Sequence, residues 1–557
     1  MKKTGAFILL VIFLFFIGPF LLYPLFHVTS VALFPGGQFS LGYFYHLFSH
    51  PTIGRSILNS LSIALITTAL SALIALPLAF LFTRFRFPGK TLFGGLLLLP
   101  LIIPPFVGAI GMRQILARFG SLNLLLLKCG LLKAPIDWLG YARLWGVVLV
   151  EALHLFPIFY LNAAAALANV DPTLEEAALN LGSNRLRTFF KITVPYVLPS
   201  LFSGAVLVTL WSFTDLGTPL VFQMREVVPV QIFDRALELS DNPEGHALVM
   251  VMLLLSITLF FLGKKLSHLR YGPGQTKGAS FREEKSLSLS STVFVLAFIG
   301  FVLFLACLPH LAVFLTSIRG KWFMSVLPES YTLDYYKRAL GHELALSSIR
   351  NSIFLSGVST VIDTLFGVVI AYLLARKKTP LTSLFDGLVM FPLAIPGVVM
   401  AFGYLAAFSG SPLDPKLNPL PLLAIAYAVR RMPYMVRMSY GGFLQVETNL
   451  EEAGANLGSP PFKTFWKITL PLVGASVLAG AILTFAFSLL EVSESLILAF
   501  REEYFPLTKT IYQLLGRIED GPYLASALGV WAMAFLGVSF LLASLLLGRR
   551  LGQLFRV

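Results

Sequence analysis

The chain alternates long apolar segments with short polar ones, which is the pattern of a protein that crosses a membrane many times. A helix needs roughly 20 apolar residues to cross the hydrocarbon layer of a bilayer. The first half contains six such segments, near residues 6–33, 56–82, 92–117, 143–169, 196–222 and 244–264. The second half contains six more, near residues 290–318, 350–375, 384–408, 418–446, 472–500 and 521–548. We therefore expect an all-α polytopic membrane protein with about 12 transmembrane helices.

One polar segment occurs twice along the chain. Leu174–Pro195 and Leu450–Pro471 are identical at 14 of 22 positions and lie 276 residues apart. Asn59 and Asn351 form another matching pair, 292 residues apart. The two offsets, 292 and 276, differ because the first half has 16 additional residues around residues 118–142. We expect a longer external loop or a short surface helix there. The pattern predicts a duplicated protein.

The duplication divides the chain into three parts. We expect a first repeat at residues 1–264, a cytoplasmic linker at 265–289 and a second repeat at 290–557. Each repeat has an even number of helices. Both copies therefore have the same orientation in the membrane, as parallel repeats do, and both polar segments face the same side.

Composition excludes several classes of protein. Hydrophobic residues make up 57% of the chain and charged residues only 13%, about half the charge of a soluble protein. Two distant cysteines, Cys129 and Cys307, indicate neither a disulfide framework nor a zinc site. The sequence has no GxxxxGK[ST] loop, so it has no nucleotide site of that kind. We expect no catalytic residues, no bound metal, no cofactor and no nucleic-acid partner.

The basic residues predict the orientation. Segments rich in Lys and Arg stay in the cytoplasm. With the N-terminus inside, the basic clusters close to helix ends are all cytoplasmic: Arg84/Arg86/Lys90, Lys264/Lys265, Arg376-Lys377-Lys378 and Arg549-Arg550. Both termini are then cytoplasmic, and the net charge of +14 is mainly an orientation signal.

The repeated polar segment has the signals of a short helix. Asp171-Pro172-Thr173 is a helix start, because Asp or Thr can cap the first turn. Acidic side chains in that turn suit the positive end of the helix. Gly182 ends the helix, and Pro195 is expected to open the next membrane helix. The result is an amphipathic helix on the membrane surface. A solvated surface helix without a partner is the alternative, which the second copy disfavours.

The repeated segment resembles the EAA loop of binding-protein-dependent ABC importer permeases. The pattern E-A-A/G-x-x-L-G, followed by I-T-x-P, occurs in both halves, and the second copy departs from it at Gly454. The resemblance implies that the loop docks on an ATPase subunit, with the glycines needed to form the docking helix and the second glutamate of each copy orienting it. The coupling residues are then Glu175, Glu176, Ala177 and Gly182 in the first copy, and Glu451, Glu452, Ala453 and Gly458 in the second.

The resemblance also implies partners and a location. It implies the type I ABC importer permease fold in a bacterial cytoplasmic membrane. The partners would be two copies of an ABC ATPase, which bind the ATP, and a periplasmic or lipid-anchored solute-binding protein. The segments 430–434 and 215–219 make the chain most similar to fused permeases of the ferric-iron type. Permeases for thiamine, polyamines, sulfate or phosphonates share much of this pattern, and a stand-alone secondary transporter is a further alternative.

Ionisable residues inside membrane segments are costly and are therefore functional candidates. Asp215 and Glu491 occupy equivalent positions in the expected fifth helix of each half. The other candidates are Glu494, Arg430, Arg431 and Arg437. These groups either line a translocation path or gate it, or they form buried structural ion pairs such as Arg430 with Glu491.

Overall fold

The computed structural model describes residues 11, 13–102, 104–139, 143–237, 243–267, 284–341, 343–376, 380–517 and 519–547. Most of the expected linker and both termini lie outside the described residues. So do Lys377 and Lys378 and the pair Arg549-Arg550, which belong to two of the expected basic clusters. Within the described ranges the regular structure is helical except for one short parallel ladder between β1 (Phe85–Arg86) and β2 (Lys285–Ser286). The expected all-α class is confirmed.

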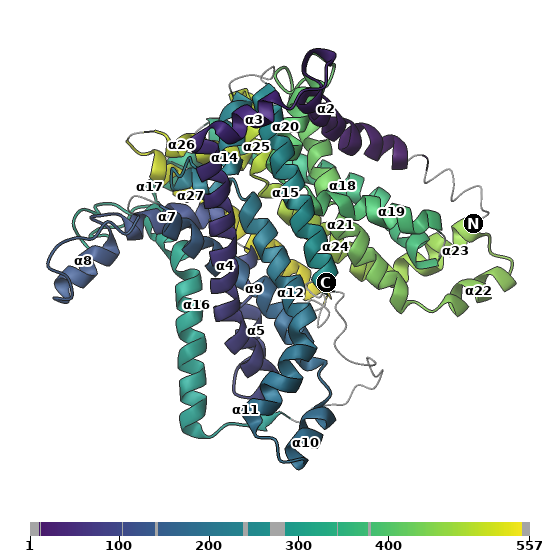
Figure 1. Ribbon diagram of the computed structural model, residues 1–557, viewed down its shortest axis with the longest axis horizontal. Helices are drawn as coiled ribbons and strands as arrows, with labels where there is room; N and C mark the ends of the chain where they lie inside the picture. Colours follow the sequence, from purple (N-terminus) through teal and green to yellow (C-terminus); the bar gives the residue numbers. More distant parts are fainter. Residues whose placement is uncertain are drawn as a thin grey trace. The chain divides into compact units, whose positions relative to one another are not determined.

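The chain forms two compact units, whose helices are labelled in Figure 1. Unit 1 consists of residues 1–54, 228–254 and 333–554, and unit 2 of residues 55–227, 255–332 and 555–557. Each unit therefore combines most of one expected repeat with segments from the other. The first helix of the second repeat packs in unit 2, and the first helix of the first repeat packs in unit 1. These units follow contacts in space, so the expected repeat boundaries at residues 264 and 290 remain predictions from the sequence.

Unit 2 contains the long helices of the first repeat. Its elements are α4 (Pro51–Arg84, whose first residues belong to unit 1), α5 (Lys90–Leu96), α6 (Leu99–Ile102), α7 (Pro105–Leu116), α8 (Ser121–Lys128), α9 (Leu144–Ala168), α10 (Pro172–Asn180), α11 (Arg185–Thr188), the π-helix η3 (Phe189–Thr193), α12 (Val194–Thr214), α13 (Gly217–Val221) and α16 (Leu289–Ser317). Helix α15 (Pro243–Ser267) continues from unit 1 into unit 2. Within this unit α16 packs along α7.

Unit 1 contains the long helices of the second repeat. Its elements are η1 (Gly18–Leu22), α2 (Tyr23–Leu33), η2 (Pro35–Gly37), α3 (Gly42–Ser49), α14 (Val228–Leu237), α17 (Asp334–Gly341), α18 (Glu343–Arg376), α19 (Pro380–Met390), η4 (Phe391–Ala394), α20 (Gly397–Phe408), α21 (Leu420–Gln445), α22 (Thr448–Asn456), α23 (Pro461–Thr464), η5 (Phe465–Thr469), α24 (Leu470–Leu489), α25 (Ser493–Leu498), η6 (Glu502–Tyr504), α26 (Leu507–Leu515) and α27 (Gly521–Leu547). Its centre is the packing of α18, α21 and α24 on one another, and α2 packs on α20.

Within the described residues, the candidate membrane spans match eleven of the twelve expected positions when each bent pair counts as one span. In the described part of the chain, nine helices are long and apolar enough to span a membrane, or eleven if two bent pairs each count as one span. Helix α21 is long enough, but every 18-residue stretch of it contains Arg430, Arg431 and Arg437. These three charges make its sequence more polar than that of the other spans, although it lies where the tenth helix is expected.

The third helix of each repeat is broken, which the sequence analysis missed. In unit 1 the chain bends by 99° between residues 384–394 and 397–408, and in unit 2 by 89° between residues 90–101 and 105–128. Pro396 and Pro104 stand directly before the second segment of each pair and have extended backbones. A proline restricts the preceding residue to extended conformations and cannot donate the next helical hydrogen bond, so the helix restarts after it.

The fifth helix of each repeat differs from the expectation at both ends. In unit 2 the helical backbone runs from Arg185 to Thr214 through α11, η3 and α12, and Pro195 is the second residue of α12, so the span begins before the proline that was predicted to open it. A π-turn precedes the proline, with the Val194 amide donating to the Phe189 carbonyl. This wider turn accommodates a residue that lacks an N–H group. The second repeat has the same π-turn before Pro471.

The same asparagine contact occurs in both repeats. Asn59 Nδ2 donates to the backbone oxygen of Glu226 at 2.8 Å, and Asn351 Nδ2 donates to that of Glu503 at 2.9 Å. In each unit the amide fastens the segment that follows the fifth helix to the second helix. This segment re-enters the unit as short helices, α13 in unit 2 and α25 and α26 in unit 1.

Candidate functional site

Helix α10 forms the first copy of the repeated polar segment. Asp171 Oδ1 accepts hydrogen bonds from the Thr173 amide at 2.9 Å and from the Thr173 hydroxyl at 2.8 Å, so Asp171 is the predicted N-cap. Gly182 has φ +84°, in the left-handed region. The Ser183 amide donates to the Ala178 carbonyl at 3.0 Å, which closes the helix end. The predicted start and end of this helix are both confirmed.

Helix α22 repeats the C-terminal end of this geometry in unit 1, whereas its N-cap residue, Glu447, makes no side-chain capping hydrogen bond. Gly458 has φ +79°, and the Ser459 amide donates to the Gly454 carbonyl at 3.0 Å. Gly454, where the sequence departs from the EAA pattern, is buried against η5. A Cβ at this position would come within 3.1 Å of Ile468 and 3.3 Å of Thr464. The departure therefore allows α22 to lie closer to η5 than an alanine would.

The two glutamates of each copy have different surroundings. Glu176 and Glu452 are exposed, as are Ala177 and Ala453. Glu175 and Glu451 instead form ion pairs with Arg84 and Arg376, at the ends of α4 and α18.

An exposed apolar side chain lies at the C-terminal end of each surface helix. Leu181 is 88% exposed and Leu457 is 89% exposed, and they occupy equivalent positions in the two copies. Figure 1 shows α10 and α11 at the end of unit 2 where α12 begins, and α22 and α23 in the corresponding place in unit 1. Each surface helix thus offers a leucine at its tip, which is suitable for contact with another protein.

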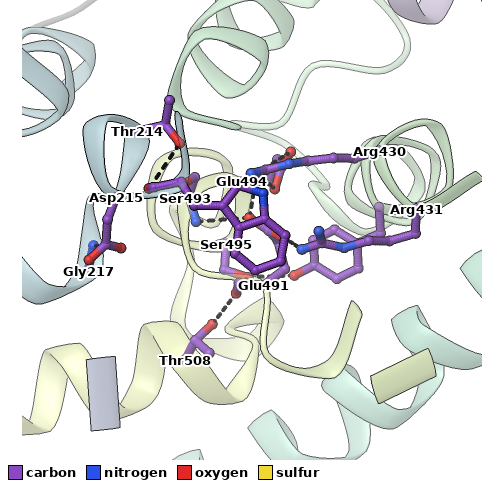
Figure 2. Close-up of polar contacts among 12 residues, drawn as sticks. Thr214, Asp215, Gly217, Arg430, Arg431, Glu491, Ser493, Glu494, Ser495 and Thr508 are labelled. Carbon is purple, nitrogen blue, oxygen red and sulfur yellow. Dashed lines mark hydrogen bonds and ion pairs between the residues drawn. The ribbon is translucent and has the colours of Figure 1, made fainter. Parts of the chain in front are cut away.

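A charge cluster of Arg430, Arg431, Glu491 and Glu494 lies inside unit 1. Figure 2 shows both arginines extending from α21 toward the two glutamates. Arg430 Nη1 lies 2.9 Å from Glu491 Oε1 and 3.2 Å from Glu494 Oε2, and Arg431 pairs with Glu491 Oε2. Glu494 is fully buried and Glu491 nearly so. The structure therefore contains the buried Arg430–Glu491 ion pair that the sequence analysis gave as one of its two interpretations.

The backbone around Glu491 is fixed by hydroxyl groups. Ser495 Oγ and Thr508 Oγ1 each donate to the Glu491 carbonyl at 2.6 Å, and Tyr427 and Ser495 share a hydrogen bond of 2.5 Å between their hydroxyls. Gly397 at the start of α20 lies against the cluster. A Cβ on Gly397 would come within 1.6 Å of Arg430 Nη1, so only glycine leaves room for the guanidinium.

Two candidates lie apart from the charge cluster. Arg437 pairs with Asp386 at 3.1 Å, and both side chains are exposed. Asp215 belongs to unit 2, and its carboxylate accepts from the Gly217 and Thr218 amides, each at 3.1 Å. The sequence predicted Asp215 and Glu491 inside the fifth helices, but both residues follow the ends of these helices, α12 and α24. The prediction was wrong because the apolar pattern continues into the re-entrant segments, which hydropathy cannot distinguish from a span.

Two buried carboxylates were missed by the sequence analysis. Glu151 on α9 is 1% exposed, pairs with the Ser212 hydroxyl and lies 3.5 Å from Thr67 Oγ1. Asp363 on α18 is completely buried. Both lie in expected membrane helices, so the rule applied to Asp215 and Glu491 could have found them. In the described part of the chain, no group of three or more His, Cys, Asp and Glu residues is placed to hold a metal ion.

Long apolar helices in two sets, each with a surface helix after its fourth span that ends at a left-handed glycine, are the features of a membrane permease of the ABC importer class. The chain belongs to the family of binding-protein-dependent transport system inner membrane components, which matches residues 71–268 and 364–556. It is thus a fused, two-half permease with the type I permease fold, a multi-pass protein of the inner membrane and a translocation subunit.

Relatives match the chain over most of its length. The ferric transport system permease protein FbpB of Actinobacillus pleuropneumoniae is 27% identical over 531 residues, which cover 93% of this chain and 74% of that relative. A putative ferric transport system permease, FbpB 1 of Haemophilus influenzae, is 26% identical over 88% of this chain and 77% of its own length. The molybdate/tungstate permease WtpB of Pyrococcus furiosus is 35% identical over 36% of this chain and 78% of its own length.

Proposed function

We propose that this chain is the membrane subunit of an ATP-driven importer of ferric iron. The observation that carries the proposal is the similarity to ferric transport permeases over 93% and 88% of the chain. The molybdate/tungstate relative, although more similar in the matched part, covers only about a third of it. The chain receives its solute from a binding protein outside and works with two ATPase subunits in the cytoplasm, where both termini lie.

The surface helices α10 and α22 are the contacts for the ATPase subunits. Each has an exposed glutamate, Glu176 or Glu452, near its start and an exposed leucine at its tip. A single exposed leucine is common on protein surfaces, so the proposal rests on the repetition of the whole surface helix in both units. Two such helices, built alike in the two units, suit two copies of one partner.

The charge cluster acts as a fixed or gating contact and not as a ligand set for iron. Both carboxylate oxygens of Glu491 are already taken, Oε1 by Arg430 and by the Ser493 amide and Oε2 by Arg431. With both glutamates ionised, the four charges sum to zero, which suits a region surrounded by apolar helices. A cation passing this point would have to displace an arginine first.

The experiment is to reconstitute the permease with its ATPase and its binding protein in proteoliposomes and to measure ATP hydrolysis. Binding protein loaded with Fe³⁺ should stimulate hydrolysis, and labelled iron should accumulate inside. Stimulation by a binding protein loaded with molybdate, and not with Fe³⁺, would overturn the assignment of iron. Accumulation of iron without ATP would overturn the importer mechanism.

A further inference from the structure

A buried ion pair fastens α10 to the end of α4. Arg84 is the last residue of α4, and its Nη1 donates to Glu175 Oε2 at 2.8 Å while Nη2 pairs with Oε1. Thr193, the last residue of η3, donates its hydroxyl to Glu175 Oε1 at 2.6 Å. The Arg84 side chain is 7% exposed. Glu175 therefore links three elements: the second helix, the surface helix and the base of the fifth helix.

The second repeat contains the same three-way link. Arg376, the last residue of α18, donates through Nε to Glu451 Oε1 at 2.9 Å. Thr469, the last residue of η5, donates to the same oxygen at 3.2 Å. Tyr372 adds a hydrogen bond to Glu451 Oε2 at 3.2 Å. The two arginines are 292 residues apart and the other two pairs 276 apart, the same offsets that relate the repeats.

These links attach surface helices that bury few of their own residues. Helix α10 has no buried residue, and Gly454 is the only buried residue of α22. Little apolar packing therefore fixes either helix. Charge-assisted and bidentate hydrogen bonds are about twice as strong as neutral ones and fix orientation as well as distance. Shielded from water, such a pair is weakened less by salt than an exposed one.

We propose that Arg84, Glu175 and Thr193, and equally Arg376, Glu451 and Thr469, are positioning residues that transmit movement of the surface helices to the second and fifth helices. When an ATPase subunit displaces a surface helix, the link makes the ends of α4 and α12, or of α18 and α24, move with it. Glu175 and Glu451 thus connect the surface helices to the membrane helices, while the exposed Glu176 and Glu452 face the ATPase. This inference rests on the proposed function, because it requires an ATPase at α10 and α22.

The test compares the wild-type complex with the double variant Arg84→Gln, Arg376→Gln and with the double variant Glu175→Gln, Glu451→Gln. Both abolish the ion pairs, and the second keeps the arginines in place in case the first fails to fold. Lys90→Gln is the matched control, because it removes a more exposed pair, with Glu284 (2.7 Å), in the same unit. The measured quantities are the ATPase that copurifies with the permease and the solute imported per ATP hydrolysed.

We expect both double variants to copurify with the ATPase normally and to import at least about fivefold less solute per ATP, the lower limit of typical coupling between sites. The Lys90→Gln complex should behave as wild type. An unchanged import ratio in either double variant would overturn the inference, and so would loss of ATPase copurification, which would assign these residues to docking. Failure of the wild-type complex to couple hydrolysis to import would instead refute the proposed function.

Discussion

Arg430 Nη1 lies 2.9 Å from Glu491 Oε1, inside unit 1 and at the point where the fifth span of the second repeat ends. Replacing Glu491 by Gln leaves Arg430 paired with Glu494 and removes the ion pair of Arg431. Removing one partner of a buried pair costs about 3–5 kcal/mol. We therefore expect Glu491→Gln to lower the thermal stability of the purified permease, and the double variant Arg430→Gln, Glu491→Gln to recover much of the loss because its charges again balance.

An exposed ion pair provides the control for this measurement. Arg338 pairs with Asp520 in the same unit, with the Arg338 side chain 57% exposed. Arg338→Gln should cost only about 0–1 kcal/mol. A Glu491→Gln variant as stable as the wild type would show that the charge cluster contributes nothing to the folded state, and normal transport by it would remove Glu491 from the functional residues.

Gly397 offers a test of the cluster that changes no charge. An alanine there would place its Cβ 1.6 Å from Arg430 Nη1, so the guanidinium must move away from the glutamates. Overpacking of this kind typically costs about 1–3 kcal/mol. A Cβ on Gly387, in α19, would meet nothing within 4 Å, so this glycine provides the matched control. We expect reduced stability and transport for Gly397→Ala and neither for Gly387→Ala; equal behaviour would contradict the tight contact.

The glycines that end the surface helices are required for their backbone conformation alone. A Cβ at Gly182 or Gly458 would meet nothing within 4 Å, but their φ values of +84° and +79° are costly for other residues, by about 1–2 kcal/mol each. Replacing both by valine should displace the helix ends and reduce import per ATP, while the permease remains in the membrane. Full transport by this double variant would refute a coupling role for the helix ends.

A native cysteine can test the topology. Cys129 is exposed and lies in the segment that we expect on the external side of the membrane, whereas Cys307 lies within the membrane helix α16. A thiol reagent that cannot cross membranes should label Cys129 in spheroplasts. In a Cys129→Ser background, Leu181→Cys should be labelled only after permeabilisation. Labelling of Leu181→Cys in intact spheroplasts would reverse the proposed orientation.

Local signals in the sequence predicted the surface helices well. An N-cap at Asp171 and a glycine at position 182 act within one turn of the helix, so their effect does not depend on distant parts of the chain. The repeat offsets also predicted equivalent contacts, because Asn59 and Asn351 make the same hydrogen bond in the two units. Equivalent sequence positions thus have equivalent partners.

Long-range packing and helix breaks were beyond the sequence analysis. Apolar composition continues through the breaks at Pro104 and Pro396 and past the ends of α12 and α24, so hydropathy alone merged separate elements. The packing of α2 on α20 and of α16 on α7 joins segments from different repeats, which no periodicity along one segment can indicate. The Arg84–Glu175 pair was equally hidden, since its residues are 91 positions apart.

Cross-linking at the tips of the surface helices tests the central claim most directly. Leu181→Cys and Leu457→Cys, introduced together into a cysteine-free permease, place one reactive thiol on each exposed tip. With a short bifunctional reagent we expect each thiol to link to one ATPase subunit, giving a permease joined to two ATPase copies, and each single variant to give a permease joined to one. Absence of any ATPase adduct, in membranes where both thiols react with a small maleimide, would contradict the account.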